Sequence, residues 1–311
     1  MKRPGAKRLL RAVDDYLKLR RMLGFKLFHE TWWLPDFVSY LDQNRSSFIT
    51  IDLAIRWAMQ PTGVDRSWWG RRLGAVRQFA RHYRAVDPRT EIPSRDLIPF
   101  RSPRRAPYLY TNTDVVALIR AATALPHPLL AASYSSLIGL LATTGMRVGE
   151  ALGLDDADFD RTRGLVVIRG AKFNKTREVP LHASTLAALT AFSRRRDRQR
   201  PHRRSSSLFL SSTGAPVAYS NFRTTFRRLV KVTEIGDGRL KPRIHDLRHS
   251  FAVNTLRDWY RAGADVDPRM PWLSAYLGHV NATTTYWYLT ATPELVTLAA
   301  KRLEWSWMVS S

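Results

Sequence analysis

Cysteine is absent from the 311-residue sequence, which excludes disulfides, thiol nucleophiles and cysteine-based zinc sites. Long apolar runs are absent too. The longest, residues 137–142, falls far short of the roughly 18 residues that a membrane helix needs. No apolar signal segment follows the basic residues 1–11, so we expect a cytoplasmic protein. Apolar residues nevertheless make up 44% of the chain, which predicts folded domains rather than disorder.

Acidic residues are scarce: 26 Asp and Glu stand against 50 Lys and Arg, which gives a net charge of +24. The net charge is +9 over residues 1–100 and +15 over residues 101–311, so the excess is not a basic tail. Such an excess repels itself unless a polyanion neutralises it. Nucleic acid is the first candidate, because Lys and Arg contacts to phosphates dominate its binding. An anionic membrane surface is the alternative, although no Lys-rich amphipathic helix is evident.

The first hundred residues show the periodicity of helices. Apolar residues recur every three or four positions in three stretches: Leu9, Val13, Tyr16 and Leu17; Trp33, Phe37, Tyr40 and Leu41; and Trp69, Leu73, Val76, Ala80 and Tyr83. Beside the last stretch stand Arg77, Arg81 and Arg84, which predict either a phosphate-binding face or a solvated basic face.

Between residues 87 and 107 five prolines recur, with Arg101, Arg104 and Arg105 among them. Proline at this density stops helices and favours an extended linker. We therefore expect one domain over residues 1–100, a basic linker over about 87–107, and a second domain over 108–311. Two basic domains joined by a basic linker suggest a clamp that closes around a duplex.

The second domain has a mixed pattern. We expect helices that begin at Thr111 or Thr113, that end near Gly145, and that begin at Ser220, together with helices near 184–200, 245–260, 271–277 and 283–288. Residues 164–169 and 177–181 predict paired strands joined by a basic loop. The fold class is therefore mainly α with a small β-sheet.

Residues 142–153 and the basic loop each offer groups for phosphate chemistry. Gly145 and Gly149 let the backbone turn around Arg147, and Glu150 follows within one helical turn. A guanidinium placed there can offer a fixed fork of donors to a phosphate, although a surface Arg–Glu pair is the alternative. A lysine of the loop, Lys172 or Lys175, could donate a proton if its pKa were lowered; a solvated hairpin tip is the alternative.

Two further runs contain histidine. His245 and Arg248 are three residues apart and would share one face of a helix, which joins a donor fork to a group that moves protons near neutral pH. Gly278 is expected to end a helix and to leave His279 at its exit, with tyrosines seven and nine residues later. The alternatives are a packing or capping histidine and an aromatic core patch.

Together, and in this order, these runs resemble the tyrosine recombinases, or phage-type integrases. The family pattern is an arginine in a T-G-x-R-x-x-E box, a lysine on a β-hairpin, then H-x-L-R-H, L-G-H and a tyrosine nine residues after that histidine. The resemblance is strong over residues 108–295 and general over the N-terminal helices. It assigns catalysis to Arg147, Lys172, His245, Arg248, His279 and Tyr288, with Glu150 orienting the site. It favours Tyr288 over Tyr286 and Lys172 over Lys175, which takes the role if the loop register slips.

The resemblance implies site-specific DNA recombination through a covalent 3′-phosphotyrosyl intermediate. Arg147 and Arg248 would grip the phosphate, and His279 would add a hydrogen bond. His245 would accept the proton of Tyr288, and Lys172 would protonate the leaving 5′ oxygen. Because the covalent link keeps the phosphodiester energy, no metal and no cofactor are expected.

The resemblance also implies an all-α, SAM-like core-binding domain and a mixed integrase catalytic domain that form a C-shaped clamp on double-stranded DNA. A tetrameric synapse is expected, in which residues 290–311 dock on a neighbouring protomer; a helix packed on its own domain is the alternative. The host would be a phage or another mobile element, and sister recombinases could act beside the chain. The expected DNA contacts are Arg77, Arg81, Arg84, Arg101, Arg104, Arg105, Lys175 and Arg177.

Two other functions fit part of the sequence. A type IB topoisomerase uses a similar set of residues to relax supercoiled DNA, although the L-G-H box and the separate helical domain favour a recombinase. A DNA-binding module without catalysis fits the charge equally well, but it would not need the complete set of site residues. The target DNA sequence is left open.

Overall fold

A computed structural model of the chain describes residues 3–99, 106–169, 176–202, 205–236, 240–279, 281, 283–290 and 292–300. The chain divides into two compact units, residues 1–104 and 105–311, and each is described by itself. Within the described residues, no helix is long and apolar enough to cross a membrane.

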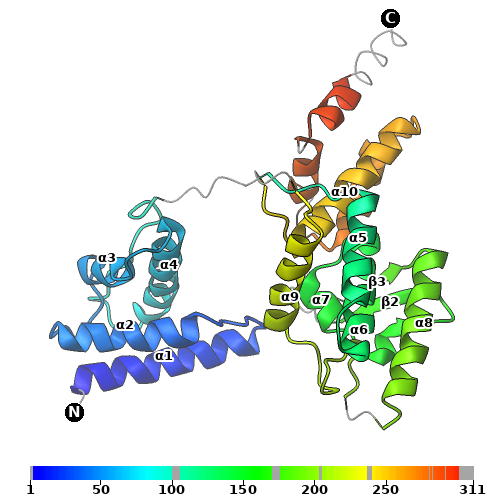
Figure 1. Ribbon diagram of the computed structural model, residues 1–311. Coiled ribbons are helices and arrows are strands. Elements are labelled where there is room, and N and C mark those ends of the chain that lie inside the picture. Colours follow the sequence, from blue (N-terminus) through cyan, green and yellow to red (C-terminus); the bar gives the residue numbers. More distant parts are fainter. Residues whose placement is uncertain are drawn as a thin grey trace, which may run out of the picture. The chain divides into compact units, whose positions relative to one another are not determined.

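The first unit is helical and contains α1 (Pro4–Met22), α2 (Glu30–Gln43), α3 (Ile51–Met59) and α4 (Arg66–Tyr83), drawn in blue to cyan in Figure 1. The apolar stretches expected from periodicity form the buried faces of α1, α2 and α4. Periodicity did not predict α3, because this helix is too short for the spacing of its apolar residues to repeat. It begins where the Thr50 side chain accepts a hydrogen bond from the backbone N–H of Leu53 (3.3 Å).

Residues 87–99 were expected to begin the linker, but they pack on the first unit. Asp87 accepts hydrogen bonds from Arg8 (2.8 Å) and Arg89 (2.9 and 2.8 Å), and the N–H of Glu91 donates to the carbonyl of Ile49 (2.9 Å). Ile98 lies in the core of this unit. The prolines do stop the helix, but ion pairs and backbone hydrogen bonds hold the extended chain that results. Any free linker therefore begins after residue 99.

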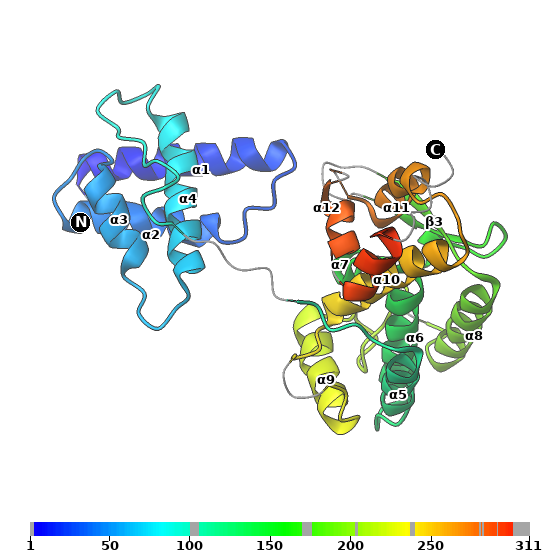
Figure 2. The ribbon, with the colours of Figure 1, turned by 90° about the horizontal axis from the view of Figure 1, so that it is seen from above.

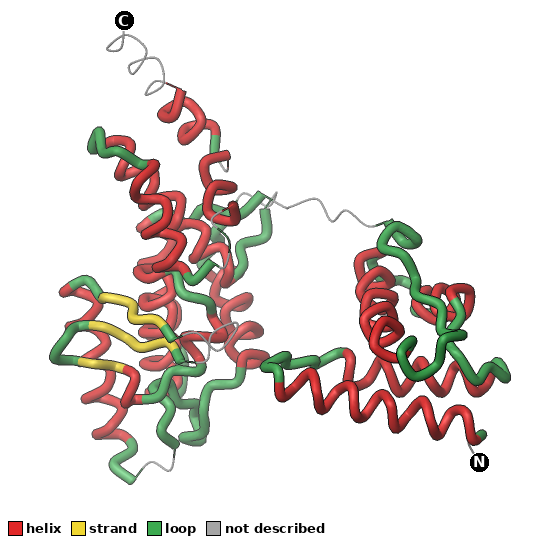
Figure 3. Tube along the Cα trace, turned by 180° about the vertical axis from the view of Figure 1, so that it is seen from behind, coloured by secondary structure: helices red, strands yellow, loops and turns green. Residues whose placement is uncertain are grey.

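The second unit surrounds one main core with α5 (Asn112–Thr123), α6 (Pro128–Thr144), α8 (Ala183–Gln199) and α9 (Tyr219–Val232). Its sheet is antiparallel, in the order β1 (Phe159–Asp160), β2 (Leu165–Ile168) and β3 (Arg177–Pro180), as Figure 3 shows in yellow. Val166 on the central strand lies opposite Phe159 on one side and Val179 on the other, and all three are buried.

The remaining elements of this unit are α7 (Val148–Leu152), α10 (Ile244–Arg261), α11 (Met270–Leu277), α12 (Thr283–Tyr286) and three 3-10 turns, η1 (Asp156–Asp158), η2 (Asp267–Arg269) and η3 (Trp287–Thr290). α7 packs on the main core, whereas α10, α11 and the segments around η2 and η3 build a second apolar cluster. α11 packs against α12, which Figure 2 shows beside it, and η3 packs against α10. The cluster joins Val253 and Leu256 of α10 to Leu273 of α11, to Tyr288 and to Leu295.

The predicted class, mainly α with a small antiparallel sheet, is confirmed. Two local predictions were wrong. β1 was not anticipated, because two residues carry no readable alternation. Ser220 does not cap α9, which begins at Tyr219 directly after Ala218.

Candidate functional site

The turn between α6 and α7 presents Arg147. Gly145 ends α6 in the left-handed conformation (φ 60°), and a Cβ there would lie 2.5 Å from the Phe251 ring, so glycine fits both the turn and the packing. Arg147 then stands directly before α7, where its backbone N–H donates to Oε2 of Glu150 (2.9 Å). The predicted tight turn around Arg147 is thus present.

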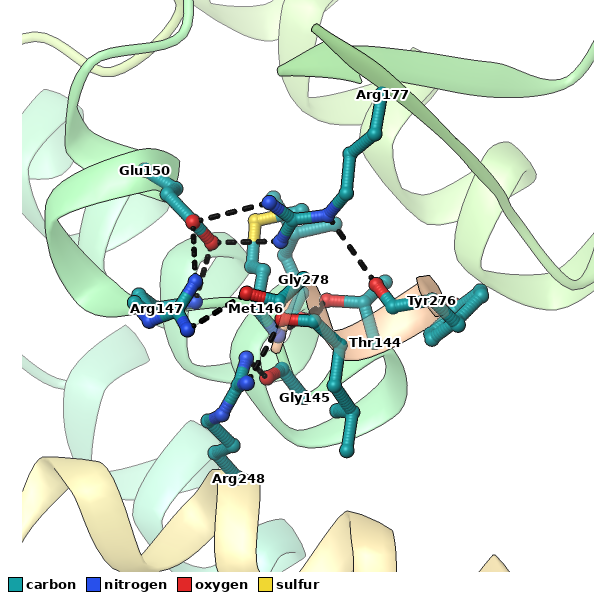
Figure 4. Close-up of polar contacts among 11 residues, drawn as sticks. Thr144, Gly145, Met146, Arg147, Glu150, Arg177, Arg248, Tyr276 and Gly278 are labelled. Atoms are coloured by element: carbon teal, nitrogen blue, oxygen red, sulfur yellow. Dashed lines mark hydrogen bonds and ion pairs between the residues drawn. The ribbon is translucent and has the colours of Figure 1, made fainter. Parts of the chain in front are cut away.

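Glu150 lies between two arginines from different elements. Its carboxylate accepts from Arg147 Nη1 (2.9 Å) and from both terminal nitrogens of Arg177 on β3 (3.0 and 2.8 Å), as Figure 4 shows. Burial alone would raise the Glu150 pKa, but the hydrogen bonds and charge of Arg177 and Arg147 lower it to about 2. This carboxylate is therefore ionised and ties β3 to the α6–α7 turn.

The segment that ends α11 is gripped by both predicted phosphate-binding arginines. Arg248 donates to the carbonyls of Gly145 (2.8 Å) and Leu277 (2.7 Å), and Arg147 Nη2 donates to the carbonyl of Gly278 (2.9 Å). Arg248 is buried. Desolvation first, and then the nearby charge of Arg147, lower its pKa to about 10, so it remains a cation at neutral pH.

Gly278 leaves room for Arg177. It ends α11 with φ 69°, and a Cβ on it would lie 2.5 Å from Nη1 and 2.7 Å from Cζ of Arg177. Nε of Arg177 also donates to the Tyr276 carbonyl (3.2 Å). Arg177 was predicted to contact DNA. The structure places its guanidinium inside the site, against Glu150 and the end of α11.

The predicted histidines lie around Arg248. His245 is exposed on α10, yet desolvation of its ring and the positive charge of Arg248 lower its pKa. His279 is half-buried after α11, and its Nδ1 lies 2.7 Å from Oγ1 of Thr285. Desolvation, followed by the charges of Arg248 and Arg147, lowers the His279 pKa to about 4. Both rings are therefore neutral near pH 7 in the DNA-free protein.

Tyr288 is 2% exposed and forms part of the second apolar cluster, whereas Tyr286 is 43% exposed. The Tyr288 ring stacks near the His279 ring, with centroids 6.1 Å apart. Its hydroxyl lies 3.2 Å from Nδ1 of His249. In the sequence, His249 was recognised only as the last residue of the H-x-L-R-H run, and no role was predicted for it. Its spacing of four from His245 was the signal that both rings share one face of α10.

The residues expected to contact DNA lie in different environments. Arg81 on α4 and Arg84 directly after it are exposed. Arg77 donates to the carbonyls of Pro93 (2.8 Å) and Ser94 (2.7 Å), so it holds the segment after α4 on the first unit. Lys172, Lys175, Arg101, Arg104 and Arg105 lie outside the described residues.

A basic face on α9 was missed. Arg223, Arg227 and Lys231 are exposed at intervals of four residues, opposite the buried Phe222 and Phe226. The same helical spacing that revealed the apolar face could have revealed this one. No group of three or more His, Asp or Glu side chains in the described parts of the chain could hold a metal ion.

The sequence matches the phage integrase family over residues 110–294. It is 43% identical over 304 residues to y4rB, a candidate integrase/recombinase of Sinorhizobium fredii, which covers 95% of this chain and 97% of that protein. It is 32% identical over 208 residues to the tyrosine recombinase XerD of Mycobacterium tuberculosis, covering 65% of this chain and 61% of XerD.

Solved structures share the fold. The XerH recombinase in its post-cleavage complex with palindromic difH substrate matches with a TM-score of 0.64 and 18% identity over 88% of this chain and 78% of that chain. The Tn1549 transposon integrase in complex with transposon right end DNA matches with a TM-score of 0.63 and 18% identity over 94% of this chain and 99% of that chain.

Proposed function

We propose a reaction and a set of residue roles for this chain, which belongs to the phage integrase family and is therefore a tyrosine-type site-specific recombinase. In the proposed reaction, Tyr288 attacks a phosphodiester of double-stranded DNA, forms a 3′-phosphotyrosyl bond and releases a 5′ hydroxyl. The reverse attack by a 5′ hydroxyl from another strand then completes strand exchange. The convergence of Arg147, Arg248 and His279 beside Tyr288 carries this proposal.

The arginines account for phosphate binding. Arg147, Arg177 and Arg248 carry three positive charges against the single carboxylate of Glu150. The surplus favours an anion, and it is fixed in place before the substrate arrives. Arg147 and Arg248 would hold the non-bridging oxygens as charge builds up in the transition state. Glu150 would orient Arg147 and reduce the net positive charge of the site.

The remaining roles follow from proton transfer. His245 and His279 would donate hydrogen bonds to the phosphate, whose negative charge would raise their lowered pKa values. Lys172, or Lys175 if the loop register differs, would protonate the 5′ oxygen as it leaves. The phosphotyrosyl bond conserves the energy of the broken phosphodiester, so resealing needs no cofactor.

DNA is the proposed partner, because the surplus positive charge of the site suits a phosphate and the net charge of +24 suits a polyanion. Arg81 of α4, Arg84 directly after it and the exposed basic face of α9 would contact the DNA backbone. A DNA substrate would place the protein in the cytoplasm of its host. The likeness to y4rB and to the Tn1549 integrase favours a mobile element as the host of this enzyme.

A tetrameric synapse remains part of the proposal, and the C-terminal segment has a narrower role in it. Leu295 is fully buried in the second apolar cluster, and Glu294 forms an ion pair with Arg261 (2.5 Å). Residues 293–300, which are helical, thus pack on their own domain through Leu295. Val296 is 51% exposed on this helix. Docking on a neighbour would fall to such exposed residues and to residues 301–311, which lie outside the described residues.

A nicked suicide duplex tests the chemistry, because loss of a short strand traps the covalent adduct. DNA ends of the mobile element that encodes the chain would serve as substrate. Wild-type protein should form an adduct that peptide mapping places on Tyr288. Tyr288→Phe should form none, and Tyr286→Phe, the matched control, should behave as wild type. An adduct on another residue, or none, would refute the assignment. Relaxation of supercoiled DNA without recombination of two sites would favour a topoisomerase.

A further inference from the structure

His249 lies beside both the nucleophile Tyr288 and His245. It follows Arg248 on α10, but the two side chains diverge: Arg248 is buried against the α6–α7 turn and the end of α11, whereas His249 faces η3. Nδ1 of His249 is 3.2 Å from the Tyr288 hydroxyl. Its ring packs edge-on against His245 (centroids 4.7 Å apart) and against Trp287 (5.5 Å).

The hydrogen bond between His249 and Tyr288 has a direction near neutral pH. Desolvation first, and then the charge of His245, lower the His249 pKa to about 4, so the ring is neutral. A neutral imidazole has one nitrogen without a proton, and a phenol is the better donor. In the tautomer that carries its proton on Nε2, Nδ1 can accept the proton that Tyr288 must lose as its oxygen attacks phosphorus.

We propose that His249 is a catalytic residue of this recombinase and accepts the hydroxyl proton of Tyr288 during DNA cleavage. This inference rests on the proposed function, and it moves the base from His245 to the next histidine on the same face of α10. His245, which is exposed, is then left to bind the phosphate.

The proton balance is closed by the groups already named. As the Tyr288 oxygen bonds to phosphorus, its proton passes to Nδ1 of His249, and the bond from phosphorus to the 5′ oxygen breaks. The lysine of the hairpin supplies a proton to that 5′ oxygen. In the rejoining step a 5′ hydroxyl attacks phosphorus and gives its proton back to the hairpin lysine. The phosphotyrosyl bond breaks, and the imidazolium of His249 returns its proton to Tyr288.

The surrounding charges support a base that works only with DNA bound. The titratable and charged groups that face His249 are His245, Asp246 and Arg248 of α10, Arg243 before it, His279 after α11, and Tyr288 on η3. Without DNA, desolvation of the ring and the positive neighbours together outweigh Asp246 and make His249 a weak base. A phosphate bound by Arg147 and Arg248 adds negative charge, which raises the histidine pKa values around it. The base would thus strengthen when a substrate is present.

The decisive test separates activation of the nucleophile from protonation of the leaving group. Two suicide duplexes are used at saturating protein. One is natural, and one carries sulfur in place of the bridging 5′ oxygen, so that its leaving thiolate needs no acid. His249→Asn keeps a hydrogen-bond acceptor close to the position of Nδ1 but cannot take a proton. His249→Gln is measured as a second replacement that cannot take a proton, with a side chain of different length. His182→Asn is the matched control, because His182 is an exposed residue that caps a helix.

At about pH 7 we expect both His249 variants to cleave both duplexes about 100-fold more slowly than wild type, and His182→Asn to match wild type. Lys172→Ala should be slow on the natural duplex alone. The deficit of the His249 variants should shrink as the pH rises towards about 9, because solvent then removes the tyrosine proton.

Three results would overturn the inference. These are His249 variants that cleave within about threefold of wild type, a deficit that sulfur repairs, and a deficit that stays constant with pH. In each case a wild-type adduct on Tyr288 would leave the proposed function standing. Absence of that adduct from wild-type protein would instead refute the proposed function itself.

Discussion

Replacing Glu150 by glutamine removes the one carboxylate that Arg147 and Arg177 share. Glutamine keeps the size of the side chain and one acceptor oxygen, so the change isolates the charge. It leaves two guanidinium groups, with side chains 36% and 14% exposed, facing each other without compensation. Taking away one partner of such a buried pair is costly, because the charge that remains cannot be hydrated fully.

The size of the effect follows from the Glu150 pKa, which is about 2 in the folded chain against an ordinary value of 4.5. At about 1.36 kcal/mol for each tenfold change in the acid constant, the ionised carboxylate stabilises the fold by about 3 kcal/mol. The folded pKa lies below the unfolded one. The contribution is therefore complete above pH 4.5 and is lost as the pH falls towards 2.

Hydrogen exchange in increasing urea measures this for the second unit alone, through peptides from α6 and α7. We expect Glu150→Gln to lower the free energy of unfolding by about 3 kcal/mol at about pH 6, and by only about 1 kcal/mol at about pH 3. Glu178→Gln is the matched control, because Glu178 pairs with Arg163 on the exposed surface of the same sheet. That substitution should change stability little at either pH.

Equal stability of wild type and Glu150→Gln at about pH 6 would refute the claim that Glu150 ties β3 to the α6–α7 turn. A loss that stays the same at low pH would attribute the effect to packing rather than to charge.

The remaining predictions concern Gly278, Arg248 and the C-terminal segment. Gly278→Ala should push Arg177 aside and strain the left-handed turn, so single-turnover cleavage should fall about 100-fold while DNA binding by gel shift is largely kept. Arg248→Lys should also slow cleavage about 100- to 1000-fold, because an ammonium cannot hold two carbonyls and a phosphate together; wild-type rates would contradict this. Leu295→Ala should cost about 2–5 kcal/mol of unfolding free energy in the second unit, whereas truncation after residue 300 should weaken assembly on DNA with little effect on monomer melting.

The sequence predicted the long elements well because their periodicity is repeated several times. α1, α4, α6 and α10 each bury a continuous apolar face, and the predicted helices coincide with them. Short elements such as α3 and β1 carry too few residues for a period to be read. Residues 87–99 were misread because proline density reports the absence of helix and not the absence of packing.

The sequence predicted that several side chains lie together, but not which groups they contact. Spacing along one helix placed His245 with Arg248, and motif order placed Arg147 and His279 in the same site. Arg177 was assigned to DNA because its partners, Glu150 and Tyr276, are 27 and 99 residues away. His249 was overlooked for the same reason, since its partner Tyr288 is 39 residues away. Contacts over such separations are set by tertiary packing, which local patterns do not encode.

Two of the carbonyls that orient the arginines belong to the backbone of Leu277 and Gly278. Every amino acid carries a backbone carbonyl, so these contacts do not depend on the identity of most side chains along α11. Leu273 and Leu277 need only stay apolar to keep the helix seated, and exposed positions such as Trp272 are free to vary. Gly278, in contrast, cannot be substituted without disturbing the turn. Mutational tolerance along α11 should therefore end abruptly at this glycine, although the residue contributes no side chain to the reaction.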